Sequence, residues 1–308
     1  MKNFFLYCLI LGLCACHTTQ QTGFESKTTD EGVCILENGD TVLFYQSSTK
    51  SMSGEYPRAD YIHPLYDLKG EILTEDFPED HLHQRGIFWT WHQVWIGEER
   101  MGDAWETRDF IWDVQETSTS HTDDGSIILN TETLWKSPLY INKKGVKEAF
   151  ARETAGIKVY PAEEYFRMID FEIHIHALVD GLKIGGSEDP KGYGGFSVRM
   201  KLPDDVLFKG VNGLVEPQNL AINAGPWVDI SGTGASGIRG ITIVDHPGNP
   251  GYPQPWILRK KESMQNPAYP GRFPVEIPRA EPMVLKYRLI IHNGDMETTA
   301  ISKLVSGF

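Results

Sequence analysis

The chain has 308 residues, of which 40% are hydrophobic, enough to bury a sizeable core in one large domain or two ordinary ones. Its formal net charge is -13, so most of its surface repels the phosphates of nucleic acid, and we exclude nucleic acid as a partner. An anionic ligand therefore has to meet a locally basic pocket. The composition is that of a globular enzyme or binding protein.

The N-terminal sequence predicts a targeting segment. Lys2 precedes an apolar run over residues 4–13, which is too short to cross a bilayer as a mature helix. The sequence Leu13-Cys14-Ala15-Cys16 resembles the cleavage box of bacterial lipoproteins, which implies cleavage before Cys16 and lipid on its sulfur. A plain secretory signal cut nearby is the alternative, and both interpretations export the protein.

We therefore expect a signal peptide at residues 1–15, and a lipidated Cys16 with a polar tether at residues 16–30. The membrane is then a partner only through the lipid anchor, and we expect the protein to face the periplasm. After removal of the signal peptide and acylation of Cys16, Cys34 has no cysteine partner, so no intramolecular disulfide is expected.

From Val33 onward the sequence pattern is typical of β-structure. Short alternating runs are separated by clusters of Gly, Pro, Asn and Asp, and no long helical period competes with them. With 30 glycines and 18 prolines as turn residues, this pattern predicts an all-β fold, a large antiparallel β-sandwich in a single domain over residues 31–308. The clearest predicted strands cover residues 41–45, 126–134, 165–177, 195–202 and 282–292.

The most unusual stretch runs from Asp80 to His92, with three of the ten histidines. If residues 80–85 are extended, alternation places His81, His83 and Arg85 on one face. Imidazole exchanges a proton near neutral pH and arginine binds a carboxylate with two hydrogen bonds, so the cluster indicates a site for an anionic, hydroxyl-rich ligand. The alternative is that the neighbouring tryptophans are core and the histidines are satisfied surface groups.

A second histidine-rich segment lies within the predicted strand at residues 165–177. Alternation places Glu172, His174 and His176 together on one face and apolar side chains on the other. Such a face suits a metal ion, but the solvated face of an edge or outer strand explains the same pattern, and we favour that interpretation.

Two later loops carry candidate polar groups. Residues 185–195 are rich in glycine and hold Tyr193, shortly before Arg199. Residues 245–256 form a proline-pinned loop with His246, Asn249 and Trp256, and prolines lower the entropy cost of holding side chains in place. Functional and purely structural interpretations of these loops stay equally open. No nucleotide-binding loop or serine-hydrolase motif is present.

In chain order, several motifs resemble the PmoA-like family of exported bacterial proteins. They are His63-Pro64-Leu65-Tyr66, Asp76-Phe77-Pro78, Asp80-His81-Leu82-His83-Gln84-Arg85-Gly86, Trp227-Val228-Asp229, His246-Pro247-Gly248-Asn249-Pro250 and His292-Asn293-Gly294-Asp295. Where this family commonly has paired histidines before Arg-Gly, this chain has His83-Gln84, so a role for a second imidazole at that point is not supported.

The family's traditional label suggests methane oxidation, which we reject because the chain has no membrane span and no convincing copper site. The resemblance implies instead a fold similar to the galactose-mutarotase-like sugar-binding sandwich of aldose epimerases. It also implies a place in carbohydrate degradation, with relatives tied to uronic-acid-rich polysaccharides such as ulvan and an oligosaccharide dehydratase activity.

The leading hypothesis is a lyase that removes water from the terminal uronic acid of a short oligosaccharide. This reaction needs a cation for the carboxylate, a base and an acid. The candidate catalytic residues are His83 and His246 as base and acid, Tyr193 as a substitute for either, and Arg85 for the carboxylate. The candidate substrate-binding residues are His81, His92, Trp91, Arg199, Asn249 and Trp256.

Two other functions stay open. A glycosidase or epimerase acting on the same sugars is one, although a conventional glycosidase needs two facing carboxylates, and Glu188, Asp189 and Glu216 are unconvincing as a pair. A non-catalytic, lipid-anchored carbohydrate-binding protein is the other. The leading hypothesis requires no cofactor, and a divalent metal ion held by His81, His83 and His92 stays open.

Overall fold

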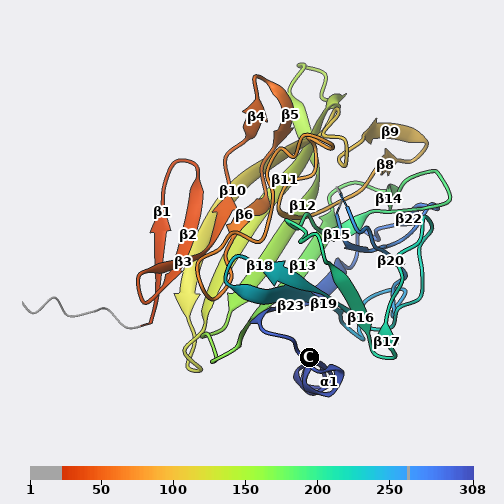
Figure 1. Cartoon of the computed structure of the whole chain (residues 1–308). Helices are drawn as coiled ribbons and strands as arrows, with labels where there is room; N and C mark the ends of the chain where they lie inside the picture. The colour runs from red at the N-terminus through yellow and green to blue at the C-terminus, as the bar shows by residue number, and fades with distance from the viewer. Residues whose placement is uncertain (1–22, 262–263) are drawn as a thin grey trace, which may run out of the picture.

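The computed structural model describes residues 23–261 and 264–308, and the predicted signal peptide and Cys16 lie outside these ranges. The chain folds into stacked antiparallel sheets, which confirms the predicted all-β sandwich (Figure 1). The smaller main sheet contains, in spatial order, β1 (Phe24–Thr28), β2 (Gly32–Glu37), β3 (Asp40–Gln46), β6 (Tyr61–Leu65), β7 (Ile87–Thr90) and β15 (Gly195–Val198).

The larger main sheet has nine strands. In spatial order these are β10 (Ile111–His121), β11 (Ile127–Ile141), β12 (Lys147–Val159), β13 (Phe166–Ala177), β23 (Met283–Asn293), β19 (Gly237–Asp245), β18 (Trp227–Gly234), β16 (Leu207–Gly210) and β17 (Gly213–Leu214). Each of the five clearest predicted strands overlaps a strand in the structure, in β3, β11, β13, β15 and β23.

Three small sheets extend the sandwich at its edges. One has the order β22 (Val275–Glu276), β14 (Leu182–Gly185), β8 (Gln93–Ile96) and β9 (Glu99–Gly102). The others pair β20 (Trp256–Ile257) with β21 (Asn266–Pro267), and β4 (Lys50–Met52) with β5 (Glu55–Arg58).

The predicted tether is wrong over residues 24–28. Residues 24–28 form β1, which pairs antiparallel with β2 from Phe24 opposite Glu37 to Thr28 opposite Val33. An edge strand needs only one partner for its backbone, and the Phe24 side chain is buried. The polar composition of this segment therefore reflects its exposed face.

Alternation along β13 explains how the two main sheets stack. Ile169, Phe171 and Ile173 point inward and are buried, whereas Asp170 and Glu172 point outward. Burying a side chain such as Phe or Ile stabilises the fold by about 1.5–3 kcal/mol. The solvated outer face predicted for this strand is therefore what the structure has.

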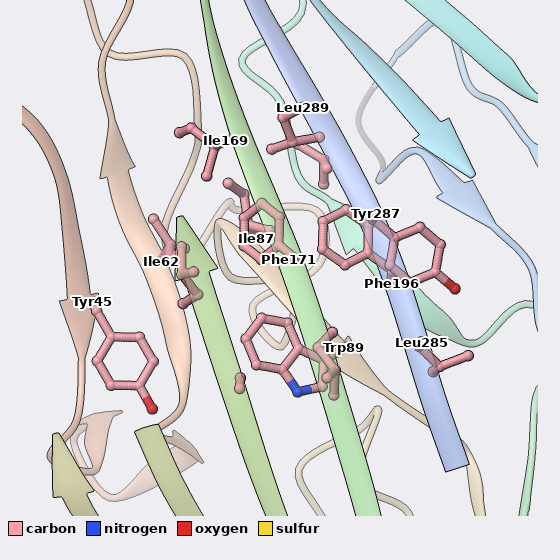
Figure 2. Packing of buried hydrophobic residues seen from close by; sticks show 14 of the residues in the cluster. Tyr45, Ile62, Ile87, Trp89, Ile169, Phe171, Phe196, Leu285, Tyr287 and Leu289 are labelled. Atoms are coloured by element: carbon pink, nitrogen blue, oxygen red, sulfur yellow. The ribbon is translucent and has the colours of Figure 1, made fainter. Parts of the chain in front are cut away.

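Aromatic rings from both main sheets meet in the core (Figure 2). The centroid of the Trp89 ring lies 6.2 Å from that of Phe171 on the facing sheet. Phe196 stacks on Tyr287 with ring centroids 4.4 Å apart. These contacts fix β7 and β15 against the larger sheet. The strand β7 follows His81 and His83 in the chain, and β15 follows the glycine-rich loop.

A short C-terminal helix, α1 (Thr298–Val305), covers part of the outer face of the larger sheet (Figure 1). Its Ile301 is fully buried in a cluster with Trp227, Val244 and Ile290. Within residues 23–261 and 264–308, no helix has the length and apolar character needed to span a membrane.

A buried polar network lies between the main sheets. Glu153 accepts hydrogen bonds from the indole nitrogens of Trp89 at 2.6 Å and Trp135 at 3.0 Å, and Tyr45 donates to Asp60 at 2.6 Å. Burial, followed by the charge of Asp60 and a hydrogen bond to it, raises the pKa of Glu153 well above its usual value. Folding therefore favours the protonated, neutral form of Glu153.

This network predicts a stability that falls with rising pH. The folded state keeps the Glu153 proton above the pH at which the unfolded chain releases it, so the free energy of unfolding decreases as the pH rises through the folded-state pKa. Glu153→Gln keeps a neutral, hydrogen-bonding side chain that does not titrate, so it should flatten the decrease that begins above about pH 4.3, where a glutamate of the unfolded chain releases its proton. Chemical denaturation measures this, and an unchanged slope would contradict the assignment.

Candidate functional site

The histidine-rich stretch is a turn, so the expected extended conformation of residues 80–85 is wrong. The amide of Gln84 donates to the carbonyl of His81 at 2.9 Å, and the amide of His81 donates to that of Pro78 at 3.1 Å. In a turn the side chains no longer alternate between two faces. Consequently His81 and His83 line one cavity, while Arg85 is buried elsewhere.

Arg85 is a structural cation, and its predicted role in binding a substrate carboxylate is wrong. Its side chain is fully buried and pairs with Asp76. It also donates to the hydroxyl of Tyr61 at 2.5 Å, and its guanidinium carbon lies 3.4 Å from the centroid of the Phe77 ring. These contacts occupy the guanidinium.

Arg199 is likewise occupied. It donates to Glu75 at 2.7 Å, to Asp80 at 2.6 Å and to the side-chain oxygen of Gln84 at 2.9 Å, and it is 2% exposed. The hydrogen bonds to Asp80 and Gln84 join the C-terminal end of β15 to the turn that carries His81 and His83. Arg199 therefore positions the turn, and the prediction that it contacts substrate is wrong.

A cavity of about 300 Å³ opens beside this turn, and we call it the histidine pocket. Three of its described lining side chains, Lys191, Arg259 and Lys261, are cationic, and one, Glu106, is a carboxylate. The lining residues are His81, His83, Gln84, Trp105, Glu106, Lys191, Tyr193, Ile257, Arg259, Lys261 and Met264. The basic pocket that an anionic ligand requires on this acidic protein is thus present.

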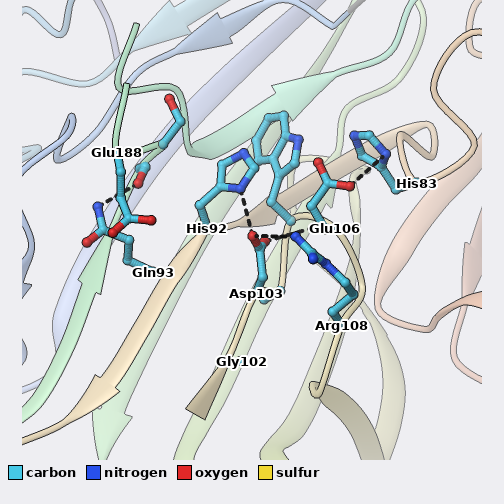
Figure 3. Close-up of polar contacts among 12 residues, drawn as sticks. His83, His92, Gln93, Gly102, Asp103, Glu106, Arg108 and Glu188 are labelled. Atoms are coloured by element: carbon cyan, nitrogen blue, oxygen red, sulfur yellow. Dashed lines mark hydrogen bonds and ion pairs between the residues drawn. The ribbon is translucent and has the colours of Figure 1, made fainter. Parts of the chain in front are cut away.

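His83 lies in this pocket as a neutral imidazole. Burial, followed by the positive charge of Arg58, lowers the pKa of His83 to about 3. Its Nδ1 lies 3.5 Å from a carboxylate oxygen of Glu106, which points toward it (Figure 3). The ring of His81 stands edge-on at 5.7 Å between centroids, and its Nδ1 lies 2.6 Å from Asp80. A neutral imidazole is able to accept a proton.

Tyr193 forms another wall with two further rings. Its ring meets His92 and Trp105 edge-on, with centroids 5.0 and 5.1 Å away, and His92 stacks on Trp105 at 5.3 Å. Burial, followed by the charge of Asp189, raises the pKa of Tyr193. The phenol is therefore protonated at neutral pH and able to donate a proton or a hydrogen bond.

An aspartate behind this wall orients His92. The Nδ1 of His92 lies 3.0 Å from Asp103 (Figure 3), while its Nε2 is buried and has no hydrogen-bond partner among the described residues. Burial opposes ionisation of Asp103, but the hydrogen bond and charge of His92 outweigh it, so the pKa of Asp103 is lowered. His92 is thus held behind the pocket, which its ring does not itself line.

The glycine-rich loop places Tyr193 by close backbone packing. Gly192 has a φ of +61°, and a Cβ there would lie 2.7 Å from the backbone nitrogen of Arg272. Only glycine fits such a position. The amide of Tyr193 then donates to the hydroxyl of Ser187 at 3.2 Å, which fixes the direction in which its side chain leaves the loop.

Arg58 lies beneath the pocket and is 1% exposed. Its Nη2 donates to the carbonyls of Ala104 at 3.1 Å and Trp105 at 3.3 Å, which anchors the loop that carries Trp105 into the pocket. Its guanidinium carbon lies 4.8 Å from the centroid of the Phe88 ring. Burial, followed by the charge of Arg85, lowers the pKa of Arg58 to about 9, so it is still cationic at pH 7.

Besides Arg85, Arg199 and His92, four more predicted site residues lie outside the histidine pocket. Trp91 and Trp256 are fully buried and donate to the carbonyls of Tyr269 and Gly225, so the prediction that they stack on sugar rings is wrong. Asn249 is 5% exposed and bonds Asp245 and the backbone of Lys286, so it holds its loop together. His246 lies against Phe308 on a different surface, so it does not join His83.

The metal site with three histidines, which the sequence leaves open, is not formed by the described residues. His81 and His83 meet edge-on, whereas His92 stacks on Trp105 and bonds Asp103. Over the part of the chain that the structure describes, no three His, Cys, Asp or Glu side chains are arranged to hold a metal ion.

Sequence reasoning missed four residues of this region. Trp105 and Glu106 come from the loop after β9, Asp103 lies behind them, and Arg259 follows β20. The run from Asp103 to Arg108 gathers three charged residues and a tryptophan in six positions between two strands, which is the one signal that points to a functional loop. Arg259 carries no such signal.

The fold and pocket together define a β-sandwich protein with a small cationic cavity beside a histidine turn. The chain belongs to DUF6807, a family of unknown function, whose model matches residues 32–306. No curated protein and no solved structure matches the chain. The resemblance to PmoA-like proteins stays a prediction from the sequence.

The low pKa of His83 predicts an unusual titration. We expect the ring of His83 to stay neutral from pH 8 down to pH 5, because burial and a nearby cation both disfavour the imidazolium. NMR of histidine ring protons measures this directly. A midpoint near the ordinary value of about 6.5 would contradict the described burial.

Replacing Arg58 tests the electrostatic part of this shift. Arg58→Met keeps a long apolar side chain between the aromatic rings but removes the charge, so the midpoint of His83 should rise by roughly one pH unit. The midpoint of His246, on the other surface, should not move and serves as the control. An unchanged midpoint for His83 in the folded variant would show that Arg58 has no electrostatic influence on it.

Proposed function

We propose that this protein is a carbohydrate-active lyase that removes water from the terminal uronic acid of short oligosaccharides during polysaccharide degradation. The observation that carries the proposal is the joint presence of neutral His83 and protonated Tyr193 in one cationic pocket. A base, an acid and a site for an anion are the three requirements of such an elimination.

In the proposed reaction, the uronate carboxylate lies against Arg259 and Lys191, which take the place that sequence reasoning gave to Arg85 and Arg199. The ammonium of Lys191 also lies 3.5 Å from the exposed Asp189, so Arg259 is the main cation for the carboxylate. Arg259 donates to the backbone carbonyls of Gln218 and Asn219, and none of the described carboxylates forms an ion pair with it. Its charge is therefore available to a ligand. The cations stabilise the negative charge that develops when the carbon next to the carboxylate loses its proton.

His83 takes that proton, and Tyr193 donates a proton to the hydroxyl on the next carbon. The carbon–oxygen bond breaks, water leaves, and a double bond forms between the two carbons. The proton held by His83 then returns to the tyrosinate through solvent. A bound carboxylate adds negative charge beside the imidazole and raises its pKa, so His83 becomes a stronger base once substrate is present.

The carboxylates of the pocket favour elimination over hydrolysis. Conventional glycosidases use two carboxyl groups on either side of the bond, whereas among the residues that the structure describes Glu106 is the one carboxylate that lines this pocket. Glu188 pairs with Arg100 at 3.0 Å and Glu216 with Lys260 at 2.7 Å, and neither lines the pocket. A lipoprotein that binds the same sugars without reaction is the rival function.

Export and attachment to a membrane through lipid on Cys16, facing the periplasm, belong to the same proposal. They rest on the N-terminal sequence alone.

The proposal predicts a product with one double bond and one water fewer. The chain from Thr18, incubated with short uronate-ended oligosaccharides, should show rising ultraviolet absorbance and a mass lower by one water. His83→Ala and Tyr193→Phe should each lower turnover by roughly 10²–10⁴-fold. His246→Ala, on the other surface, is the matched control and should keep turnover.

Three outcomes contradict the proposal. Products shorter by a whole sugar indicate hydrolysis. Full turnover in both folded pocket variants means that His83 and Tyr193 are not the base and acid. Tight binding without any product, across several uronates, indicates the carbohydrate-binding protein.

A further inference from the structure

A second cavity lies on the outer face of the larger sheet, away from the histidine pocket. It has a volume of about 760 Å³ and runs over β10 to β13 and β23, and we call it the outer groove. His246 and Phe308 line it beside α1, with ring centroids 4.9 Å apart. The groove shares no residue with the histidine pocket.

Strand register arranges the outward side chains of the groove in three rows across the sheet. The central row contains Ser118, Asn130, Gly156, Glu172 and Lys286. Side chains opposite each other on antiparallel strands lie about 4.5–5.5 Å apart at their Cβ atoms. The flanking rows contain Ile128, Lys158, Asp170 and Arg288 on one side, and Glu116, Glu132, Thr154 and His174 on the other.

The cations of the groove already have partners in the protein. Arg288 donates to both oxygens of Asp170 at 2.6 and 2.7 Å, and Lys286 pairs with Glu172 at 3.0 Å. Lys158 pairs with Asp124 at 2.7 Å. None of the described cations of the groove is therefore free to bind an anionic ligand. The carboxylates of Glu116 and Glu132 in the third row would repel such a ligand.

Paired carboxylates and cations still offer hydrogen bonds, since each carboxylate oxygen accepts more than one and each guanidinium or ammonium donates several. A surface of adjacent donors and acceptors matches vicinal hydroxyl groups, each of which both donates and accepts. Tyr160, whose hydroxyl donates to Asp170 at 2.9 Å, adds an aromatic ring to the wall. The chemistry of the groove therefore suits an uncharged sugar.

Gly156 gives an independent indication of a ligand. It lies in the interior of the 13-residue strand β12, where glycine weakens a strand and lacks a side chain to pack. Its φ is not in the left-handed region, and a Cβ there would meet only the side chain of Asn130, at 3.9 Å. Neither backbone conformation nor crowding within the protein requires glycine here. Its effect is to keep the centre of the groove open.

We propose that the outer groove binds a neutral stretch of oligosaccharide, with a sugar ring lying over Gly156 in the central row. The inference does not depend on the reaction proposed for the histidine pocket. The two sites differ in charge, since the pocket has cations for an acidic sugar and the groove has its charges compensated internally.

The test is substitution of Gly156 by threonine, which fills the centre of the groove with a residue that favours strands. The full chain from Thr18 is screened against an array of neutral cello-, xylo-, malto- and laminari-oligosaccharides of four to six sugars. Calorimetry then measures affinity for the best ligand. We expect Gly156→Thr to fold with an equal or higher thermal midpoint and to bind at least tenfold more weakly.

Two controls separate this result from other causes. Arg152→Thr places the same side chain on the exposed face of β12 outside the groove and should bind like the wild type. His83→Ala should also bind normally, so a failure of the proposed lyase reaction leaves this result unaffected. The inference is overturned if no neutral oligosaccharide binds, if Gly156→Thr binds as tightly as the wild type, or if His83→Ala abolishes binding.

Discussion

The proposed site depends on the hydrogen bonds that the Arg199 side chain donates to Glu75, Asp80 and Gln84. The turn that carries His81 and His83 has no strand ladder to hold it, and a loop of that length is otherwise mobile. A buried guanidinium with three acceptors fixes both ends of the turn to β15. The strand β15 is itself packed on the larger sheet through Phe196. The core therefore fixes the position of His83 through β15 and Arg199.

The buried charge of Arg58 beneath the pocket acts on the site in two ways. Moving a cation such as Arg58 out of water is costly, and a buried charge with few partners is retained in proteins for stability reasons only rarely. Here its charge adds to burial in keeping His83 neutral, and its hydrogen bonds hold the loop that brings Trp105 and Glu106 to the pocket. Arg58 therefore both holds the Trp105 loop in place and contributes to the low pKa of His83.

The two surfaces of the sandwich differ in how their charges are paired. Among the described residues the histidine pocket is lined by more cations than carboxylates, whereas each cation that lines the outer groove is paired with a carboxylate. On a protein with a net charge of -13, the first arrangement concentrates anions locally and the second does not. An oligosaccharide with both acidic and neutral sugars suits such a protein.

Much of the fold was predictable because alternation is a local property. The pattern of β13 identifies both its buried Phe171 and its exposed Glu172 without any knowledge of neighbouring strands. The candidate site was predictable only in part. His81, His83 and Tyr193 stand out by residue type, but the partners that decide a role are distant in sequence. Arg199 and Asp80 are 119 residues apart, and Arg259 reaches the pocket from a different strand altogether.

The same reasoning explains the errors. Trp91 and Trp256 were expected on a sugar-binding surface because aromatic residues serve cores and binding sites equally, and only burial separates the two uses. Arg85 was placed beside the histidines because residues 80–85 were assumed to be extended. The hydrogen bond that turns the chain between His81 and Gln84 has no signature in the sequence.

The most direct measurement is a crystal structure of the Tyr193→Phe variant with a uronate-ended disaccharide. We expect the carboxylate to lie within hydrogen-bonding distance of Lys191 or Arg259, with the carbon next to it facing the free ring nitrogen of His83. A disaccharide bound in this pocket with its carboxylate turned to solvent, or bound only in the outer groove, would contradict the proposed dehydration at the histidine turn.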